Sequence, residues 1–238
     1  MKRSEWSLTI KAVFFDMGYS LIKPNFEHPG EIFQKILNSL GIYKSLDKVK
    51  KAFLNAENEA KEVDLFSSFG KMDREEYWLQ WDALILKHLG ILDNSELVKI
   101  VQSKWVHFDD ASLYPEVRDV LSELKARGLK IGLISNIYEE GINTCLQKAG
   151  LEKTTFDIVV GVDAVGNMKP NPDIFTYALK KLKVKPEEAM FVGDDLELDY
   201  KGAKNVGMHA LLIDRTEKQK QGNLRTIKNL KEILSQID

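Results

Sequence analysis

Four groups of polar residues in this sequence carry side chains that could act in catalysis or bind a metal ion or an anion. Each group follows, or lies in the loop after, a short apolar run of the kind that forms a buried strand. They are Asp16, the pair Ser135 and Asn136, Lys169, and the acidic residues Asp194, Asp195, Glu197 and Asp199. Brought to one place, they would combine two acidic clusters with a hydroxyl and a lysine.

Each group alone has an ordinary structural explanation. An aspartate after a strand is usually a cap or turn residue, and a Ser-Asn pair is usually a turn. The acidic residues of 194–199 suit the first turn of a helix. Taken together these explanations lose force, because several carboxylates at one edge repel one another unless a cation lies between them. Oxygen-only ligands of this kind suit Mg²⁺.

The four groups meet only if the apolar runs are neighbouring parallel strands. Such runs recur at 10–15, 129–134, 156–161, 189–192 and 209–213. Between most of them apolar residues recur at helical spacing, with proline before the helices and glycine after them. This alternation predicts an α/β fold with a doubly wound, Rossmann-like parallel sheet and helices on both faces. Ligands of such sheets bind outside the carboxyl ends of the strands.

Residues 24–108 break the alternation and predict four successive helices, whose apolar stripes are typical of a bundle core. The sequence therefore predicts two domains: a core formed by residues 1–23 and 109–238, and an all-helical domain formed by residues 24–108. Residues 215–223 are polar and predict a loop. After that loop, one further helix is predicted from the apolar residues Leu224, Ile227, Leu230, Ile233 and Leu234.

Composition argues against several classes of protein. Lys and Arg number 34 and Asp and Glu 36, so the net charge of -2 gives no support for a nucleic-acid or membrane partner. The single cysteine, Cys145, rules out an internal disulfide and a cysteine-based zinc site. The apolar stretch near the N-terminus is broken by Lys11 and is too short for a signal peptide. A soluble, cytoplasmic protein is expected.

With these motifs in this order, the chain resembles the haloacid dehalogenase superfamily, a large group dominated by phosphatases. The resemblance extends over nearly the whole chain and rests on four segments. They are Phe14-Phe15-Asp16, Leu133-Ile134-Ser135-Asn136, Lys169-Pro170-Asn171-Pro172-Asp173-Ile174-Phe175 and Val192-Gly193-Asp194-Asp195-Leu196-Glu197-Leu198-Asp199. The helical insert at 24–108 sits where one class of these proteins carries a cap domain.

The resemblance implies that Asp16 attacks phosphorus and forms an aspartyl-phosphate. Ser135 and the Asn136 backbone N–H would bind a phosphoryl oxygen, and Lys169 would neutralise charge on the nucleophile and the phosphoryl group. Asp195 would be an alternative ligand or would orient Lys169. The resemblance also implies a site for Mg²⁺. Its ligands would be the Asp16 carboxylate, the Gly18 carbonyl, Asp194 and, through water or at one remove, Asp199. The expected partner is a small phosphorylated metabolite, and the oligomeric state is left open.

One position departs from the family pattern. Phosphatases of the family place a second aspartate two residues after the nucleophile, where this chain has Gly18, followed by Tyr19 and Ser20 in place of Gly-Thr. The missing aspartate normally protonates the leaving oxygen and then activates water. General acid–base help of this kind is worth roughly 10²–10⁴ in rate. A glycine carbonyl still binds a metal, so the change bears on turnover more than on metal binding.

Three functions stay open at this point. The first is a phosphatase in which Tyr19 or a cap residue such as His28 supplies the proton, or whose substrate has a good leaving group. The second is a dehalogenase or another hydrolase acting at carbon, because a halide leaves without a proton; the retained Asp194 and Asp199 count against it. The third is a member that only binds a phosphorylated ligand or a partner protein. The retained nucleophile, lysine and metal carboxylates favour the phosphatase.

Overall fold

The computed structural model describes residues 10–91, 95–108, 111–215 and 224–237. Contacts divide the chain into two units, Met1–Lys23 with Ser112–Asp238, and Pro24–Ala111. Residues 1–9 of the segment considered above as a signal peptide, and most of the predicted loop at 215–223, lie outside the described residues. Within the described part, no helix is long and apolar enough to cross a membrane.

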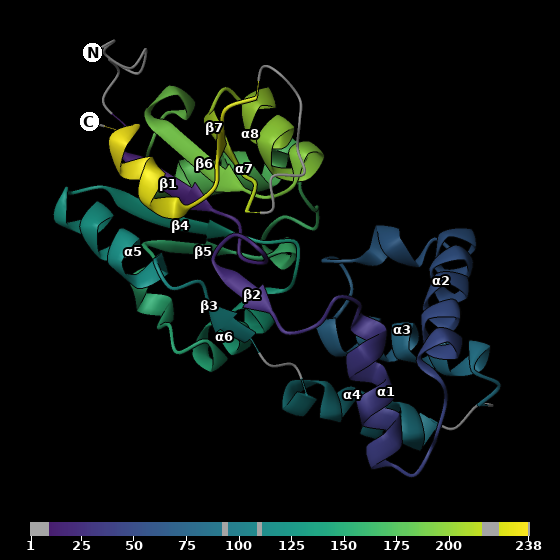
Figure 1. Ribbon diagram of the computed structural model, residues 1–238. Coiled ribbons are helices and arrows are strands. Elements are labelled where there is room, and N and C mark those ends of the chain that lie inside the picture. Colours follow the sequence, from purple (N-terminus) through teal and green to yellow (C-terminus); the bar gives the residue numbers. More distant parts are fainter. Residues whose placement is uncertain (1–9, 92–94, 109–110, 216–223, 238) are drawn as a thin grey trace. The chain divides into compact units, whose positions relative to one another are not determined.

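The first unit is built on a six-stranded parallel sheet with the order β5-β4-β1-β6-β7-β8 (Figure 1). Its strands are β1 (Ala12–Phe15), β4 (Lys130–Ile134), β5 (Ile158–Val160), β6 (Ala189–Gly193), β7 (His209–Ile213) and β8 (Thr226–Ile227). Five of them coincide with the five apolar runs, so the predicted Rossmann-like sheet is confirmed. Two further strands, β2 (Ile22–Pro24) and β3 (Ala111–Leu113), form a separate two-stranded sheet.

Helices bury the strands of this sheet on both faces. The helices are α5 (Val117–Ala126), α6 (Glu139–Lys148), α7 (Pro172–Leu182) and α8 (Gly202–Asn205), with short helical turns at Lys153–Thr155, Val162–Ala164, Pro186–Glu188, Leu196–Lys201 and Leu230–Ser235. On one face, Phe175 of α7 packs with Phe14 and Phe191 of the sheet. Val13 and Phe15 are equally buried and, because side chains alternate along a strand, point to the other face. Burial on both faces explains why the strands are continuous apolar runs.

The strand order reverses between β1 and β6, and this point positions the site. From β1 the chain builds outward through β4 to β5, and it then returns to β6 and builds toward the opposite edge. Phe15 pairs with Leu133 on one side and with Val192 on the other. The backbone N–H of Asp16 donates to the Val192 carbonyl at 2.9 Å. Asp16 and Asp194 therefore follow neighbouring strands at the crevice where such folds bind ligands.

The helix predicted from residue 224 onward is wrong in its first half. Thr226 and Ile227 form β8 and pair with Leu212 and Ile213 of β7. A short 3₁₀ helix, Leu230–Ser235, begins only after Asn229, which forms its N-terminal cap. The apolar residues recur at intervals of three, which matches the 3₁₀ repeat better than the α-helical one. The β-branched pair before the cap favours a strand.

The described residues of the second unit form four α-helices, as predicted. They are α1 (Pro29–Ser39), α2 (Leu46–Glu62), α3 (Arg74–His88) and α4 (Ser95–Phe108), with a short turn at Leu65–Ser68. Ser45 and Asp73 cap α2 and α3 by accepting hydrogen bonds from backbone N–H groups of the first turn. The apolar stripes of the helices meet in one buried cluster, which includes Phe33 and Ile85.

A single carboxyl group lies within the described core of this helical unit. The Asp82 side chain belongs to α3 and is fully buried. Its two oxygens accept hydrogen bonds from Trp105 Nε1 at 3.2 and 3.1 Å. Burial raises the pKa of Asp82 well above its ordinary range, and the Trp105 hydrogen bond opposes this only in part. The folded unit therefore favours the protonated, neutral carboxyl.

Asp82 makes the stability of the helical unit dependent on pH. Because its pKa is higher in the folded than in the unfolded state, its stabilisation is complete below the unfolded value of about 4 and is lost as the pH rises toward the folded value. Asp82→Asn cannot ionise. The Tm of this variant relative to wild type is therefore expected to rise by a few degrees between about pH 4 and pH 8.

Tryptophan fluorescence follows this unfolding, because Trp78, Trp81 and Trp105 lie in the helical unit. Glu62→Gln, which neutralises an exposed carboxylate of the same unit, is the control and should show no such trend. A Tm difference between Asp82→Asn and wild type that stays constant over this pH range would contradict the neutral buried carboxyl.

Candidate active site

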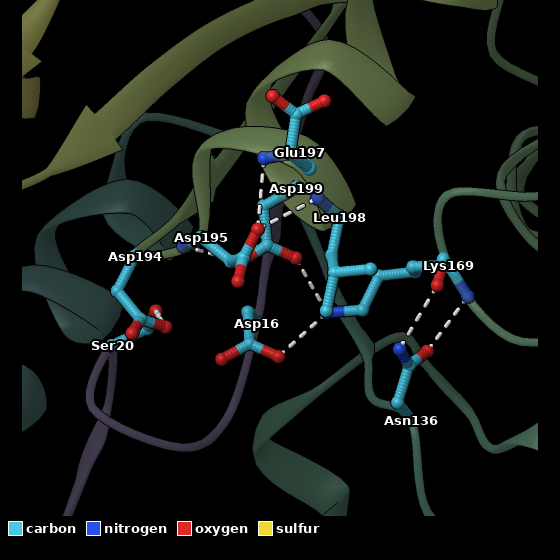
Figure 2. A network of polar contacts seen from close by, with 9 residues as sticks. All are labelled: Asp16, Ser20, Asn136, Lys169, Asp194, Asp195, Glu197, Leu198 and Asp199. Carbon is cyan, nitrogen blue, oxygen red and sulfur yellow. Dashed lines mark hydrogen bonds and ion pairs between the residues drawn. The ribbon is translucent and has the colours of Figure 1, made fainter.

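Three carboxylates and one lysine meet at the carboxyl ends of β1 and β6. Oxygens of Asp16, Asp194 and Asp199 all lie within 4.8 Å of one another. Figure 2 shows the Lys169 ammonium between two of them, 2.6 Å from Asp16 Oδ1 and 2.7 Å from Asp199 Oδ1. The fold thus brings together four of the site residues predicted from separate motifs.

The lysine is held rigidly from both ends. Lys169 is only 3% exposed, and its ammonium lies 5.4 Å from the centre of the Phe191 ring. Burial lowers its pKa, but the charges of Asp16 and Asp199 outweigh burial and raise the pKa above its usual range. Its backbone N–H donates to Asn136 Oδ1 at 2.7 Å, and Asn136 Nδ2 donates to its carbonyl at 3.1 Å. The sequence pointed only to the backbone N–H of Asn136, so this role of its side chain was missed.

The turn after β6 positions Asp199 and leaves no room for a side chain at Gly193. Asp195 caps this turn, because its Oδ1 accepts the N–H groups of Glu197 and Leu198, both at 2.8 Å. The Asp195 N–H donates to Asp199 Oδ2 at 3.1 Å. A Cβ atom at Gly193 would lie 2.3 Å from that oxygen. The sequence suggested Asp195 either as an alternative metal ligand or as the residue that orients Lys169. The residue that accepts a hydrogen bond from the Lys169 ammonium is Asp199.

The site carries more negative than positive charge. Burial, followed by the charges of Asp16 and Asp199, raises the pKa of Asp194 to about 7. Burial and Asp16 also raise the pKa of Asp199 to about 6, although the charge of Lys169 opposes this. Among the described residues of the cluster, three carboxylates face the single charge of Lys169. This charge balance and the all-oxygen donor set fit a divalent cation such as Mg²⁺.

The remaining predicted residues lie on the loops at the same edge of the sheet. Ser135 directly follows β4, is buried, and donates its backbone N–H to the Val160 carbonyl at 3.0 Å. Gly18 lies two residues after Asp16, and a Cβ atom there would meet nothing within 4 Å. Ser20 is fully buried, with its hydroxyl 3.4 Å from Asp194 Oδ1. In the sequence, the position of Ser20 in the first motif, four residues after Asp16, was the feature that could have indicated this contact.

The two proton donors considered from the sequence lie in different units. Tyr19 belongs to the sheet unit, three residues after Asp16, and is 46% exposed. His28 belongs to the helical unit and caps α1, because its Nδ1 accepts the Gly30 N–H at 2.9 Å. Its ring also packs edge-on against Phe53, with ring centres 5.4 Å apart. The cap therefore leaves only Nε2 of His28 for other partners.

Sequence analysis missed a second polar group at this edge. Arg215, two residues after β7, donates hydrogen bonds to the carbonyls of Tyr19 and Ser20 and pairs with Glu116. Its ring partner is Tyr114, whose pKa is raised, chiefly by burial. The available signal was position, because Arg215 follows a strand at the same sheet edge as Asp16.

A Rossmann-like core with a helical insert after its first strand, and with a buried aspartate and lysine at the strand ends, defines a class of hydrolases. Residues 10–207 match the family of haloacid dehalogenase-like hydrolases. The chain belongs to this family.

Individual relatives agree with this assignment. A haloacid dehalogenase-like hydrolase domain-containing protein 3 of Xenopus laevis is 33% identical over 155 residues, 63% of each chain. A ribulose-1,5-bisphosphate 5-phosphatase of Halopiger xanaduensis is 29% identical over 153 residues, 62% of each chain. These matches span less than two thirds of either relative. The solved HAD phosphatase from Thermococcus onnurineus is 27% identical, with a TM-score of 0.62 over 94% of this chain and 96% of that one.

The repulsion among the carboxylates predicts that function and stability conflict at Asp194. Without divalent cations at about pH 8, Asp194→Asn should unfold at a higher Tm than wild type, by an amount equivalent to ~1 kcal/mol, because one of three crowded charges is gone. Added Mg²⁺ should raise the Tm of wild type and leave that of Asp194→Asn unchanged.

Differential scanning fluorimetry with EDTA and with Mg²⁺ measures both effects. Asp119→Asn, an exposed carboxylate of the same unit, is the control and should respond to Mg²⁺ as wild type does. An Asp194→Asn variant that is stabilised by Mg²⁺ as much as wild type would remove Asp194 from the cation site.

Proposed function

We propose that this protein is a Mg²⁺-dependent phosphatase that hydrolyses a small phosphorylated metabolite through an aspartyl-phosphate on Asp16. One observation carries the proposal: the carboxylate of Asp16 lies 2.6 Å from a buried ammonium and within the same cluster as Asp194 and Asp199. A nucleophile, a fixed positive charge and a set of metal-binding carboxylates thus share one crevice. The phosphatase names of the Halopiger and Thermococcus relatives support the same reaction class.

The chain's own groups account for the attack on phosphorus and for binding of the phosphoryl group. Lys169 engages Oδ1 of Asp16, which leaves Oδ2 to attack phosphorus. A phosphorus–oxygen bond to Asp16 forms as the bond to the leaving oxygen breaks, and water then hydrolyses the acyl phosphate and regenerates the carboxylate. Ser135 and the Asn136 N–H would bind phosphoryl oxygens. Lys169 offsets the charge that would otherwise repel the phosphoryl group from Asp16.

The residues present fit a bound Mg²⁺. Asp16 and Asp194 would hold it directly with the Gly18 carbonyl, and Asp199, whose oxygens already bind Lys169 and the Asp195 N–H, would act at one remove. Bound there, the cation would lower the repulsion between the carboxylate nucleophile and the anionic phosphate. Together with Lys169, one divalent cation would balance the negative charge of the three carboxylates.

The absence of a carboxyl group at residue 18 favours substrates whose leaving group needs no proton. With no carboxyl group at that position, the leaving oxygen departs without a strong proton donor from the first motif. Aryl and acyl phosphates, whose leaving groups are stable as anions, are therefore better substrates than sugar phosphates. The alternative of a dehalogenase is less well supported, because a halide displacement would make no use of Asp194 and Asp199 as metal-binding carboxylates.

Hydrolysis of p-nitrophenyl phosphate tests the proposal directly. Turnover is expected with Mg²⁺ and is expected to fall to the background rate in EDTA or in Asp16→Asn, which keeps the size of the side chain but loses the nucleophile. Asp119→Asn serves as the matched control with full activity. Turnover that survives in Asp16→Asn, or absence of turnover in folded wild type with Mg²⁺, would reject the phosphatase mechanism.

Restoring the acid at position 18 is a second test. The open space around Gly18 admits an aspartate, so Gly18→Asp should speed hydrolysis of alkyl phosphates by about 10²-fold or more. Gly18→Asn adds the same bulk without an acid and should give no gain. In wild type, rates should fall steeply as the pKa of the leaving group rises. A flat dependence on leaving group would show that a proton donor is already present.

A further inference from the structure

The turn that follows the nucleophile is closed by an unusual hydrogen bond. The Ser20 N–H donates to the Gly18 carbonyl at 2.6 Å, so residues 18–20 form a three-residue γ-turn. Its central residue, Tyr19, has a φ of 54°, the left-handed region that favours glycine. A γ-turn of this hand is rare and strained, and a tyrosine at its centre adds to the strain.

Packing of the Tyr19 ring offsets this strain only in part. The residue is 46% exposed, so close to half of its surface stays in water. The backbone, in contrast, is held tightly. The Tyr19 N–H donates to the Ile22 carbonyl at 2.7 Å, and the carbonyls of Tyr19 and Ser20 both accept hydrogen bonds from Arg215. These backbone hydrogen bonds hold Tyr19 in the left-handed conformation.

Two nitrogen atoms of the Arg215 guanidinium group donate hydrogen bonds to the turn. Nε lies 3.2 Å from the Tyr19 carbonyl and one terminal nitrogen lies 2.7 Å from the Ser20 carbonyl. The other terminal nitrogen pairs with Glu116 Oε1 at 2.7 Å, and the group stacks 3.4 Å from the centre of the Tyr114 ring. A planar fork with several donors is able to satisfy all these partners at once, and a lysine is not.

The anchor of this arginine is itself fixed. Glu116 is 5% exposed, and its Oε1 also accepts the Leu230 N–H at 3.4 Å. Glu116 precedes α5 and Leu230 begins the last 3₁₀ helix, so the clamp connects three separate parts of the sheet unit. The turn at Tyr19 is thereby tied to regular structure that lies far from it in sequence.

The clamped turn carries two groups that the proposed cation site would use. One is the Gly18 carbonyl, a ligand expected from the family resemblance, which accepts the Ser20 N–H in the γ-turn. The other is the Ser20 hydroxyl, 3.4 Å from Asp194 Oδ1. If the turn relaxed, the carbonyl and the hydroxyl would both rotate away from their present directions, because the Tyr19 and Ser20 peptide planes would turn with it.

We propose that Arg215 is a positioning residue: by clamping the strained turn at Tyr19, it fixes the Gly18 carbonyl and the Ser20 hydroxyl for binding of the divalent cation beside Asp16 and Asp194. The consequence for turnover rests on the proposed function. The consequence for Mg²⁺ affinity does not require turnover.

Arg215→Lys tests this clamp while keeping a positive charge beside Glu116. The variant is expected to bind Mg²⁺ about tenfold more weakly by isothermal titration calorimetry, in the range found for partners that orient metal ligands. The kcat for p-nitrophenyl phosphate at saturating Mg²⁺ should fall, with KM little changed. Arg127→Lys is the matched control, because Arg127 also binds a carboxylate, that of Glu123, and a carbonyl, that of Leu234, but precedes the amino end of β4.

A double-mutant cycle with Tyr19→Gly separates the clamp from a general loss of stability. Glycine adopts the turn without strain, so Arg215 has less to hold in that background. Arg215→Lys is then expected to change the Mg²⁺ dissociation constant by less than about twofold. A loss of equal size in both backgrounds would overturn the proposal, since it would mean that Arg215 acts by stability alone. Tyr19→Gly alone should keep or raise the Tm.

The failure of this proposal differs from the failure of the proposed function. Wild type that binds Mg²⁺ but turns over no phosphate ester would reject the phosphatase, while the calorimetric cycle would still decide the clamp. An active wild type whose Arg215→Lys variant keeps full Mg²⁺ affinity and kcat would reject the clamp and leave the phosphatase standing. If Arg215→Lys does not fold, the same cycle with Glu116→Gln, which releases Arg215 from its anchor, decides the question by the same readouts.

Discussion

The buried ammonium of Lys169 is the interaction on which the site depends. It lies between Asp16 and Asp199, and without it three carboxylates would share one crevice with no counter-charge among the described residues. Removing one partner from a buried ion pair of this kind costs about 3–5 kcal/mol, because the other charge is left unpaired. Much of the surrounding structure, from the bonds of Asn136 to the tight approach of Gly193, serves to keep these charges in place.

The sequence predicted the strands and the residues at their ends, but not the contacts between distant loops. Asp16 and Asp194 could be found because they end apolar runs, and the carboxyl ends of parallel strands share one edge. The side-chain role of Asn136 could not, since it depends on how two loops meet in space. Arg215 acts on residues almost two hundred positions away, and no local pattern reports such a contact. The last segment was misjudged because a three-residue repeat was interpreted as α-helical.

The same structure contains buried carboxyl groups with opposite roles. In the sheet unit, Asp16 and Asp199 both pair with the buried ammonium of Lys169. In the helical unit, Asp82 has only the indole N–H of Trp105 and favours the neutral form. Burial raises the pKa of both Asp82 and Asp199, but at Asp199 the charge of Lys169 opposes it, whereas Asp82 has only a neutral hydrogen-bond donor. The buried acids of the two units thus differ in their neighbours, a cation in one and a neutral indole in the other.

The empty space beside Gly18 has a consequence for how this enzyme family diversifies. A Cβ atom at this position would meet nothing within 4 Å, so packing does not restrict it to glycine. A single amino-acid change would give the first motif two aspartates, and the core would not have to be rebuilt first.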